Sequence, residues 1–369
     1  MGSDPKAGSD ARARCLTVHA SYTCKSAGAC CTAGWAIPVD VPVYARLRGH
    51  FEGDDRLFRT GGPMPEGAAA MLALQPDGAC VFFERARGRL CRVHRELGPG
   101  SLPVACRQFP RVVLHDARGI LISLSHYCPT AAGLLHDPAP LAVVEAPSTL
   151  ALSGAAEGLD ARDALPPLLT PGMLTDIEGY DAWERRAIEV LAREITPDAA
   201  LLTIALATVR LQKWRPGCGS FQAEVHRQFD VASASEDEED QGADVARVRA
   251  VLSSVPAGLT APAIYPDFPA AWRVLEPSAV VHRAFRAYLA ARLFGNWIAY
   301  HGRGLHTIVG YLRAAHAVLK METVRQHARA STASESVSSP WQIAKEAIRS
   351  ADLLLVHLSD PKALARALD

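Results

Sequence analysis

Cysteines concentrated in the first third of the chain are the residues whose type and spacing could do chemistry. The 369-residue chain has nine cysteines, and all of them except Cys218 lie between Cys15 and Cys128. In a compartment that keeps thiols reduced, a cysteine-rich segment is more often a metal site than a disulfide framework. Soft thiolates select zinc, copper(I) or iron–sulfur clusters over hard cations. The cysteines therefore predict a thiolate-bound metal centre.

The spacing of the cysteines favours an iron–sulfur cluster slightly over zinc. A structural zinc is usually held by two C-x₂₋₄-C pairs, and the chain contains no such pair. Its one compact element is TCKSAGACC, which ends in the adjacent Cys30 and Cys31. Adjacent cysteines form a disulfide only with strain, so this pair suggests ligation, or one ligand beside a buried thiol. Because iron–sulfur clusters accept dispersed cysteines more readily, zinc is kept as the alternative.

Seven thiols are candidate ligands, which exceeds the four that one cubane cluster needs. Four are preferred for their positions, namely Cys30, Cys31, Cys91 and Cys106. The other three are Cys24, Cys80 and Cys128. Cys15 and Cys218 are predicted to be structural.

Three sequence blocks carry the candidate ligands. The first is YTCKSAGACCTAGWAIPVDVPVY, in which the adjacent cysteines precede Gly34-Trp35, an apolar run, Asp40 and Tyr44. The second is GACVFFERARGRLCRVHRELGPGSLPVACRQFPRVV, and the third is SLSHYCPTAAGLL. In this order and with these gaps, the blocks resemble the flagellin lysine-N-methylase family, a branch of the broader zinc- or iron-chelating cysteine-cluster proteins. The resemblance covers Tyr22–Leu135.

The family's pattern departs from this chain at one position. The family commonly has a further cysteine shortly before its adjacent pair, where this chain has Ser26. Two explanations stay open, since Cys24 could take that role or the further cysteine could be dispensable.

The resemblance implies an iron–sulfur protein, with a [4Fe–4S] cluster, that transfers methyl groups from S-adenosylmethionine to lysines of a flagellin-like, lysine-rich protein. Lysine attacks a methyl group only after losing its proton, so a base or a desolvated pocket is required. The sequence assigns no residue to that role, and the catalytic residues stay unknown.

Residues near the candidate ligands suggest how a cluster would be held. Arg107 and Arg111 follow Cys106 closely and could offset the charge of a thiolate cluster and tune its potential. Trp35 is predicted to pack over the site and exclude water. His94 could be a nitrogen ligand, although a hydrogen-bonded surface histidine is the stronger interpretation.

Two functions of other classes also stay open. One is a metal-chelating or redox module without methyl transfer. The other is a structural zinc protein whose helical domain binds a partner. The chain has no G-x-x-x-x-G-K-[ST], G-x-S-x-G or H-E-x-x-H motif, and no C-x₃-C-x₂-C motif of the radical S-adenosylmethionine enzymes.

The elements that must position the cysteines change character along the chain. Residues 1–14 are predicted to be a disordered leader. The cysteine-cluster module, residues 15–135, mixes Gly/Pro loops with short strand-like runs, so its own core is expected to be small. The strand-like runs are Trp35–Val43, Arg111–Leu114 and Ile120–Leu124. A connector rich in Pro, Ala and Gly follows at 136–172.

Helical periodicity dominates from residue 173 to residue 369. Apolar residues recur there at intervals of three and four positions, which predicts helices. The predicted helices are Tyr180–Ile195, Ala199–Trp214, Ser278–Tyr300, Leu305–Val324 and Trp341–Leu358. Polar loops are expected near 233–244 and 331–340. The predicted fold is therefore mainly α, a small irregular α+β cysteine-rich metal-binding module followed by a helical bundle-like domain.

The composition narrows the classes of partner. Lysine plus arginine equals aspartate plus glutamate at 39 each, so bulk charge gives no case for nucleic acid or an anionic membrane. No apolar run approaches the about 18 residues of a membrane span. The first ten residues are polar and lack the apolar core of a secretory signal. These features predict a cytoplasmic protein.

Overall fold

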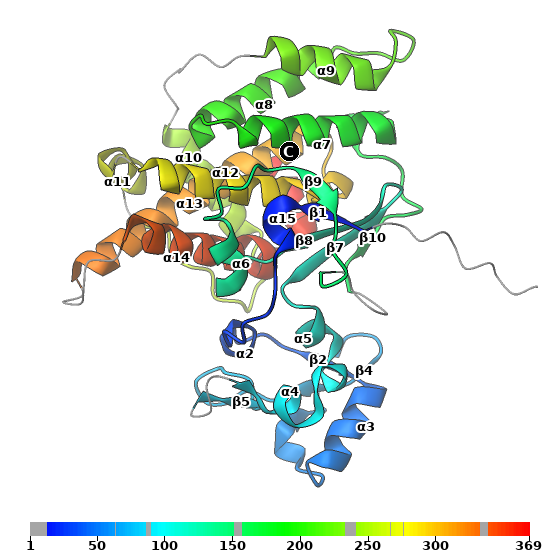
Figure 1. Cartoon of the computed structure of the whole chain (residues 1–369), viewed down its shortest axis with the longest axis vertical. Helices are drawn as coiled ribbons and strands as arrows, with labels where there is room; N and C mark the ends of the chain where they lie inside the picture. Colours follow the sequence, from blue (N-terminus) through cyan, green and yellow to red (C-terminus); the bar gives the residue numbers. More distant parts are fainter. Residues whose placement is uncertain are drawn as a thin grey trace, which may run out of the picture.

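Helices form most of the computed structural model, which has a large helical lobe and a small mixed lobe (Figure 1). The structure describes residues 13–62, 64–85, 90–150, 157–232, 241–265, 267–275, 277–332 and 339–369. The mainly α fold predicted from periodicity is confirmed. No helix in these described ranges combines the length and the apolar character that a membrane span needs.

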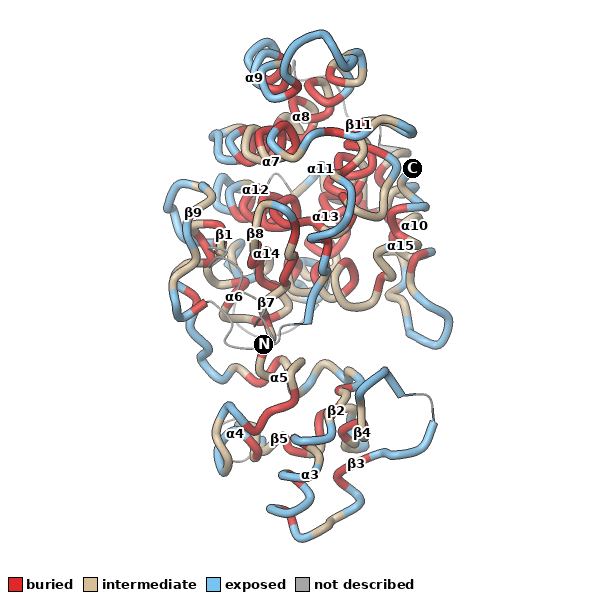
Figure 2. The backbone as a smooth tube through the Cα atoms, turned by 90° about the vertical axis from the view of Figure 1, so that its right-hand side faces the viewer, coloured by how far each residue is buried: buried red, intermediate tan, exposed pale blue. Residues whose placement is uncertain are grey.

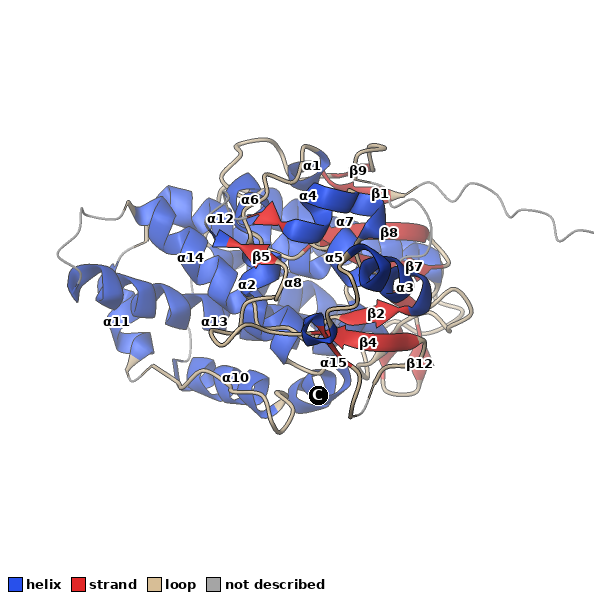
Figure 3. Ribbon diagram, turned by 90° about the horizontal axis from the view of Figure 1, so that it is seen from below, coloured by secondary structure: helices blue, strands red, loops and turns tan. Residues whose placement is uncertain are grey.

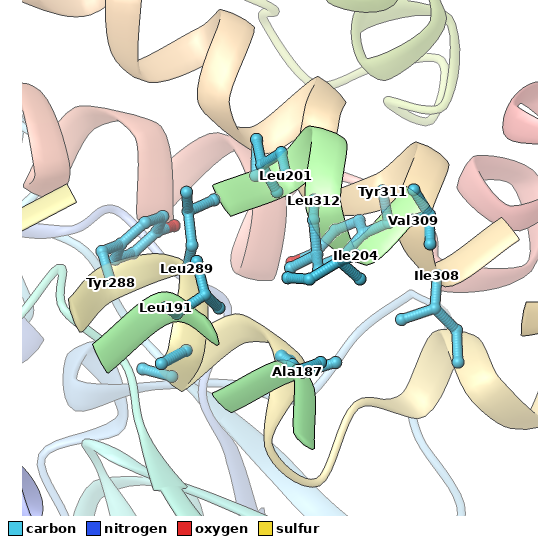
Figure 4. Close-up of a cluster of buried hydrophobic side chains, with 14 of the residues drawn as sticks. Ala187, Leu191, Leu201, Ile204, Tyr288, Leu289, Ile308, Val309, Tyr311 and Leu312 are labelled. Atoms are coloured by element: carbon cyan, nitrogen blue, oxygen red, sulfur yellow. The ribbon is translucent and has the colours of Figure 1, made fainter. Parts of the chain in front are cut away.

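Nine helices of the described chain build most of the large lobe. They are α7 (Ile177–Ala192), α8 (Pro197–Leu211), α9 (Phe221–Val231), α10 (Gln241–Ser253), α11 (Phe268–Leu275), α12 (Ala279–Leu293), α13 (Leu305–Thr332), α14 (Pro340–Asp352) and α15 (Pro361–Leu368). Helix α13 is central and packs against α8, α10, α11, α12, α14 and α15. Side chains of α7, α8, α12 and α13 meet in the main core (Figure 4). Figure 2 shows that the buried backbone is concentrated in these helices.

Helix α12 is buried more completely than its sequence pattern predicts. Apolar residues at helical spacing within Ser278–Tyr300 predict one buried face, with Arg286 pointing away from it. In the structure, however, Arg286 is only 7% exposed. The helix packs against α7, α13, α14 and the strand β8 (Gly119–Leu124), so little of its surface is left for solvent. Arg286 donates a hydrogen bond to the backbone carbonyl of Ile195, which satisfies part of its guanidinium.

A five-stranded sheet in the order β10-β7-β8-β1-β9 packs against these helices. Its strands are β1 (Arg14–Leu16), β7 (Arg111–Asp116), β8 (Gly119–Leu124), β9 (Val143–Glu145) and β10 (Leu159–Asp160). Strands β7 and β8 form an antiparallel hairpin in which Arg111 pairs with Leu124. Strand β1 runs parallel to β8. From residue 13 onward, the described chain therefore begins in the large lobe, leaves it and returns to it.

The small lobe is formed by the chain between these two visits to the sheet. Its elements are α2 (Ala29–Thr32), β2 (Pro38–Asp40), α3 (Val41–His50), η1 (Asp55–Leu57), β3 (Phe58–Arg59), β4 (Ala68–Leu72), β5 (Phe83–Glu84), β6 (Leu90–Cys91), α4 (Arg92–Leu97), η3 (Pro99–Ser101) and α5 (Val104–Gln108). A separate apolar core that includes Val39, Leu47 and Phe82 holds it together. In Figure 3 its strands β2 and β4 lie on the same side of the molecule as β7 and β8.

The lobes divide the segment predicted as one cysteine module. Strands β1, β7 and β8 and the helices α1 (Thr17–Ala20) and α6 (Pro129–Leu134) belong to the large lobe. The predicted connector contributes β9 and β10 to the sheet. It also contains β11 (Leu168–Thr170), which pairs with β12 (Met173–Leu174), the strand that follows the connector. Long-range strand pairing decides this arrangement, and local sequence patterns do not encode it.

The predicted leader and polar loops are only partly described. Residues 1–12, 233–240 and 333–338 lie outside the described ranges. At the end of the predicted leader, Arg14 lies in β1 and pairs with Asp181 at 3.2 Å. At the end of the first predicted loop, Asp244 is part of α10 and accepts a bond from Lys320 Nζ at 3.2 Å. Both residues are structured because a distant partner binds their charge. Helix α14 begins at Pro340, one residue before the predicted helix Trp341–Leu358.

Candidate functional site

The seven cysteines predicted as ligands line one cavity of about 230 Å³ (the thiol cavity). They are Cys24, Cys30, Cys31, Cys80, Cys91, Cys106 and Cys128. Most of them come from the small lobe, whereas Cys128 precedes α6 of the large lobe. Cys15 and Cys218 do not line it; Cys15 is buried in β1 and Cys218 is exposed. The fold therefore gathers thiols from widely separated segments into one place.

Local structure fixes the positions of the central thiols. The one-turn helix α2 carries Cys30 and Cys31, and Gly28 before it adopts a left-handed φ of 76° that suits glycine. The backbone N–H of Cys80 donates to the carbonyl of Cys31 at 2.7 Å, which ties two segments together. Cys91 stands at the first turn of α4.

Three of the thiols influence one another directly. The sulfurs of Cys30 and Cys31 are 3.9 Å apart. Hydrogen bonds from Cys31 to Cys30 and to Cys91 raise the pKa of the Cys31 thiol. The same hydrogen bonds lower the pKa of Cys30 and lower that of Cys91 to about 7, where the backbone N–H groups of His94 and Val93 add to the effect. At neutral pH Cys91 is therefore partly in the thiolate form, which is the reactive form of the side chain.

Cys80 and Cys106 belong to the same group of thiols, because the neighbouring cysteines influence their pKa values. Burial raises the pKa of Cys80 to about 11, and nearby Cys91 and Cys30 raise it further. Burial also raises the pKa of Cys106 well above its usual value, with added repulsion from Cys80, Cys30 and Cys91. Without a positive partner these thiols stay protonated, and a bound metal would supply that charge.

Cys24 and Cys128 lie at the other end of the cavity, beside Tyr22. The hydroxyl of Tyr22 is 3.9 Å from the sulfur of Cys128. Burial, followed by the nearby Cys128 and Cys24, raises the pKa of Tyr22. Ser26 also lines the cavity, and its backbone N–H donates to the sulfur of Cys24 at 3.4 Å. The position where the resembled family has a further cysteine therefore faces this end of the cavity.

The sulfurs do not form a ready-made binding site for a single ion. No group of three or more histidine, cysteine, aspartate or glutamate side chains within the described ranges is arranged to hold a metal ion. Zinc–sulfur bonds of about 2.3 Å in a tetrahedron would place the sulfurs about 3.8 Å apart. The sulfurs of Cys30 and Cys31, 3.9 Å apart, have a separation near that value. The donors are soft thiols, which bind zinc, copper(I) and iron–sulfur clusters in preference to hard cations.

The other predicted site residues differ in how close to the thiol cavity they lie and in how exposed they are. Arg107 and Arg111 both line the thiol cavity. Arg107 is half-buried, and no carboxylate in the described ranges pairs with it. Arg111 lies 5.9 Å from the Tyr22 ring centroid and donates to the backbone carbonyl of Leu150 at 2.7 Å. His94 is exposed at the rim.

Trp35 does not line the thiol cavity. Its ring stacks on His357 with centroids 4.3 Å apart and contacts Phe109 and Tyr127 at 5.2 and 5.5 Å. Phe109 does line the cavity, so Trp35 lies behind it and joins the two lobes. Trp35 therefore does not pack directly over the thiol cavity as predicted, but contacts Phe109, which lines the cavity.

Sequence reasoning missed a buried polar network centred on Asp352 of α14. Its carboxylate accepts hydrogen bonds from Ser125 Oγ at 2.7 Å and from the backbone N–H of Tyr127 at 3.0 Å. Tyr288 donates to it at 3.1 Å, and Arg292 lies 3.5 Å away. Asp352 is fully buried, so each of these partners offsets the cost of removing its charge from water. The sequence offers only a weak signal, because Asp352 directly precedes the apolar run Leu353–Val356.

Neutral histidines extend this network. His126 and His19 bring their Nε2 atoms within 3.2 Å, and His357 Nε2 lies 2.7 Å from Ser125 Oγ. Burial lowers the pKa of His19 to about 3 and that of His357 to about 4, and it lowers the pKa of His126 well below the usual value. All three imidazoles are therefore uncharged at neutral pH.

Ser125, His357 and Asp352 are the three residue types of a hydrolase triad, but they are not arranged as one. A triad needs the carboxylate to orient the imidazole, whose other nitrogen accepts the serine proton. Here the carboxylate bonds to the serine hydroxyl itself. The network is therefore a structural link that joins the SLSHYCP segment, and through it Cys128, to α14.

No protein-family model matches this chain, and no curated protein or solved structure is significantly similar to it.

Cys91 is expected to react with iodoacetamide along a pH profile with its midpoint near 7. The thiolate is the reacting form, and the Cys91 pKa is about 7 whereas that of Cys80 is about 11. Mass spectrometry of reduced, metal-free protein alkylated at each pH measures both rates. Cys31→Ala removes the main hydrogen-bond donor and should move the Cys91 midpoint upward. A midpoint that stays unchanged in this variant would contradict the assigned cause.

Proposed function

We propose that the thiol cavity holds an iron–sulfur cluster and that the protein is a lysine N-methyltransferase of the flagellin lysine-N-methylase type. The observation that carries the metal part is the convergence of all seven predicted thiols on one cavity. Cys30, Cys31, Cys91 and Cys106 would hold the cluster, with Cys80 close enough to replace one of them. When bound, the cluster supplies a thiolate-ligated iron centre whose potential depends on nearby charge and hydrogen bonds.

The size and chemistry of the cavity support a cluster over zinc. A space of about 230 Å³ suits several metal and sulfide atoms better than one ion in contact with four sulfurs. Apolar side chains, among them Ile37, Leu72 and Phe82, line the rest of the cavity and limit the access of water. Limited access protects a cluster from hydrolysis and oxidation, and it influences the potential.

Arg107 supports the same proposal by its charge. A cubane bound by four thiolates is anionic, and a guanidinium in the cavity wall would offset part of that charge. Arg107 lines the cavity and is half-buried, which places a cationic residue in the cavity wall.

The methyl-transfer part rests on the sequence blocks around the cysteines. In the reaction, the lysine amine attacks the methyl carbon of S-adenosylmethionine, the N–CH₃ bond forms and the S–CH₃ bond breaks. The electron pair of the broken bond stays on sulfur, giving S-adenosylhomocysteine, and the amine proton passes to a base or to solvent. The protein substrate would be a lysine-rich, flagellin-like chain.

Anaerobic purification followed by iron, zinc and labile-sulfide analysis tests the metal part. We expect iron and sulfide in about equal amounts and a brown protein with broad absorption near roughly 400 nm. Incubation of this protein with labelled S-adenosylmethionine and a flagellin-like substrate tests the transfer. Stoichiometric zinc without iron or sulfide would overturn the cluster. Absence of both donor binding and lysine labelling, with the cluster intact, would overturn the enzyme and leave the metal site.

A metal-chelating or redox module without methyl transfer is the second candidate function. The observation that favours it is the contact of Cys91, with its lowered pKa, and Cys31. A thiol of lowered pKa beside a second thiol is the usual arrangement of a redox-active pair. Metal or redox activity without donor binding would favour this candidate.

A further inference from the structure

A second cavity, of about 250 Å³, lies within the large lobe. Its walls come from the hairpin β7–β8, the end of α12, the 3₁₀ turn η4 (Trp297–Tyr300), and the π-helical segment η5 (Leu353–Leu358). Four aromatic side chains contribute to the lining, namely Phe294, Trp297, Tyr311 and His357. None of the described cysteines lines this cavity, although Arg111 lines both cavities.

Two buried N–H donors in the lining have no hydrogen-bond partner among the described residues. They are Nε of Arg292 and Nδ2 of Asn296, on side chains that are only 6% and 8% exposed as residues. The other polar atoms of both side chains are occupied. Asn296 Oδ1 accepts from the backbone N–H of Ile298 at 2.9 Å, and Arg292 donates from Nη2 to the carbonyl of Leu124 at 2.6 Å. Buried donors are nearly always satisfied, so two orphans at one cavity indicate a ligand that accepts hydrogen bonds.

Charge and shape narrow the class of ligand. Arg111 also lines the cavity, and within the described ranges its guanidinium donates to backbone carbonyls and to no carboxylate. The acidic residue of the lining, Glu157, is exposed. His357 is neutral at pH 7 because burial lowers its pKa to about 4, so it adds no competing charge. Arg292 already pairs with Asp352 at 3.5 Å, so Arg111 contributes the remaining positive charge of the lining. This charge and the two orphan donors, among aromatic walls, suit a ligand that carries an anionic group on a flat, apolar body.

We propose that this second cavity binds a small aromatic carboxylate, whose carboxylate oxygens accept from Arg292 Nε and Asn296 Nδ2. The ring would lie against the aromatic walls. The proposal goes beyond the function suggested for the thiol cavity and stands without it.

Fluorine NMR with 4-fluorobenzoate as the probe tests this proposal on the full-length protein. We expect saturable broadening and a shift of the probe signal, and no saturable effect with 4-fluorobenzyl alcohol, which has the same ring without the charge. Asn296→Asp keeps an oxygen to cap Ile298 but replaces the donor by a carboxylate, so probe affinity should fall at least tenfold. Metal content, measured on the same samples, should not change.

A second variant keeps the test decisive if Asn296→Asp fails to fold. Val356→Phe enlarges a half-buried side chain of the cavity wall and should block the probe while the melting temperature stays close to that of the native protein. The proposal is overturned if 4-fluorobenzoate shows no saturable binding to the native protein, or if both folded variants bind it as well as the native protein does.

Discussion

Cys106→Ser is expected to remove most of the bound iron and sulfide, whereas Cys218→Ser is expected to leave both unchanged. Cys106 lies in the wall of the thiol cavity within reach of Cys30, Cys80 and Cys91, so its loss removes a preferred ligand. Cys218 is exposed and lies away from the cavity, which makes it a matched control of the same chemistry. Iron and sulfide per chain after anaerobic purification measure the effect.

The same two variants test how metal binding and folding are coupled. A structural metal site contributes its binding free energy to folding, so metal loss should lower the stability of the small lobe. We expect limited proteolysis to cut the small lobe of Cys106→Ser faster, and Cys91 to become open to alkylation. The small lobe has an apolar core of its own, including Leu47 and Phe51, so it should loosen without unfolding completely. Equal metal content in the two variants would contradict the division between cavity thiols and outlying thiols.

Asp352→Ala is expected to lower the free energy of unfolding by about 3–5 kcal/mol, the usual cost of removing one partner from a buried charge pair. The substitution leaves Arg292 buried without its carboxylate partner. It also leaves the hydroxyls of Ser125 and Tyr288 and the N–H of Tyr127 without their acceptor. Urea unfolding followed by circular dichroism measures the change.

Glu346→Ala on the same helix is the matched control for this prediction. Glu346 pairs with Arg349 at 2.6 Å, but its side chain is 48% exposed, so the loss should be at most about 1 kcal/mol. If the two variants unfold at the same urea concentration, the Asp352 network does not have the structural role assigned to it. Because Tyr127 precedes Cys128, Asp352→Ala should also weaken the positioning of that thiol.

The sequence by itself determined the positions of several long helices and the group of thiols. Apolar residues at helical spacing marked α7, α8, α12, α13 and α14, because a helix that packs on one side must repeat its apolar residues every three to four positions. Periodicity alone does not mark α9, α10, α11 and α15, and the start of α10 falls inside the predicted polar loop near 233–244. The cysteines could be selected because few other roles concentrate thiols in this way.

Only the tertiary structure decided how these pieces are joined. The pairing of β1 with β8 places the start of the predicted module in the large lobe, and such a pairing between distant segments leaves no local pattern. Trp35 was assigned to the thiols from its position in the chain, yet its ring stacks on His357, which is far away in sequence. Asp352 and Asn296 look ordinary in the sequence. Their importance arises from burial, which turns a common polar group into one whose partners must be found within the fold.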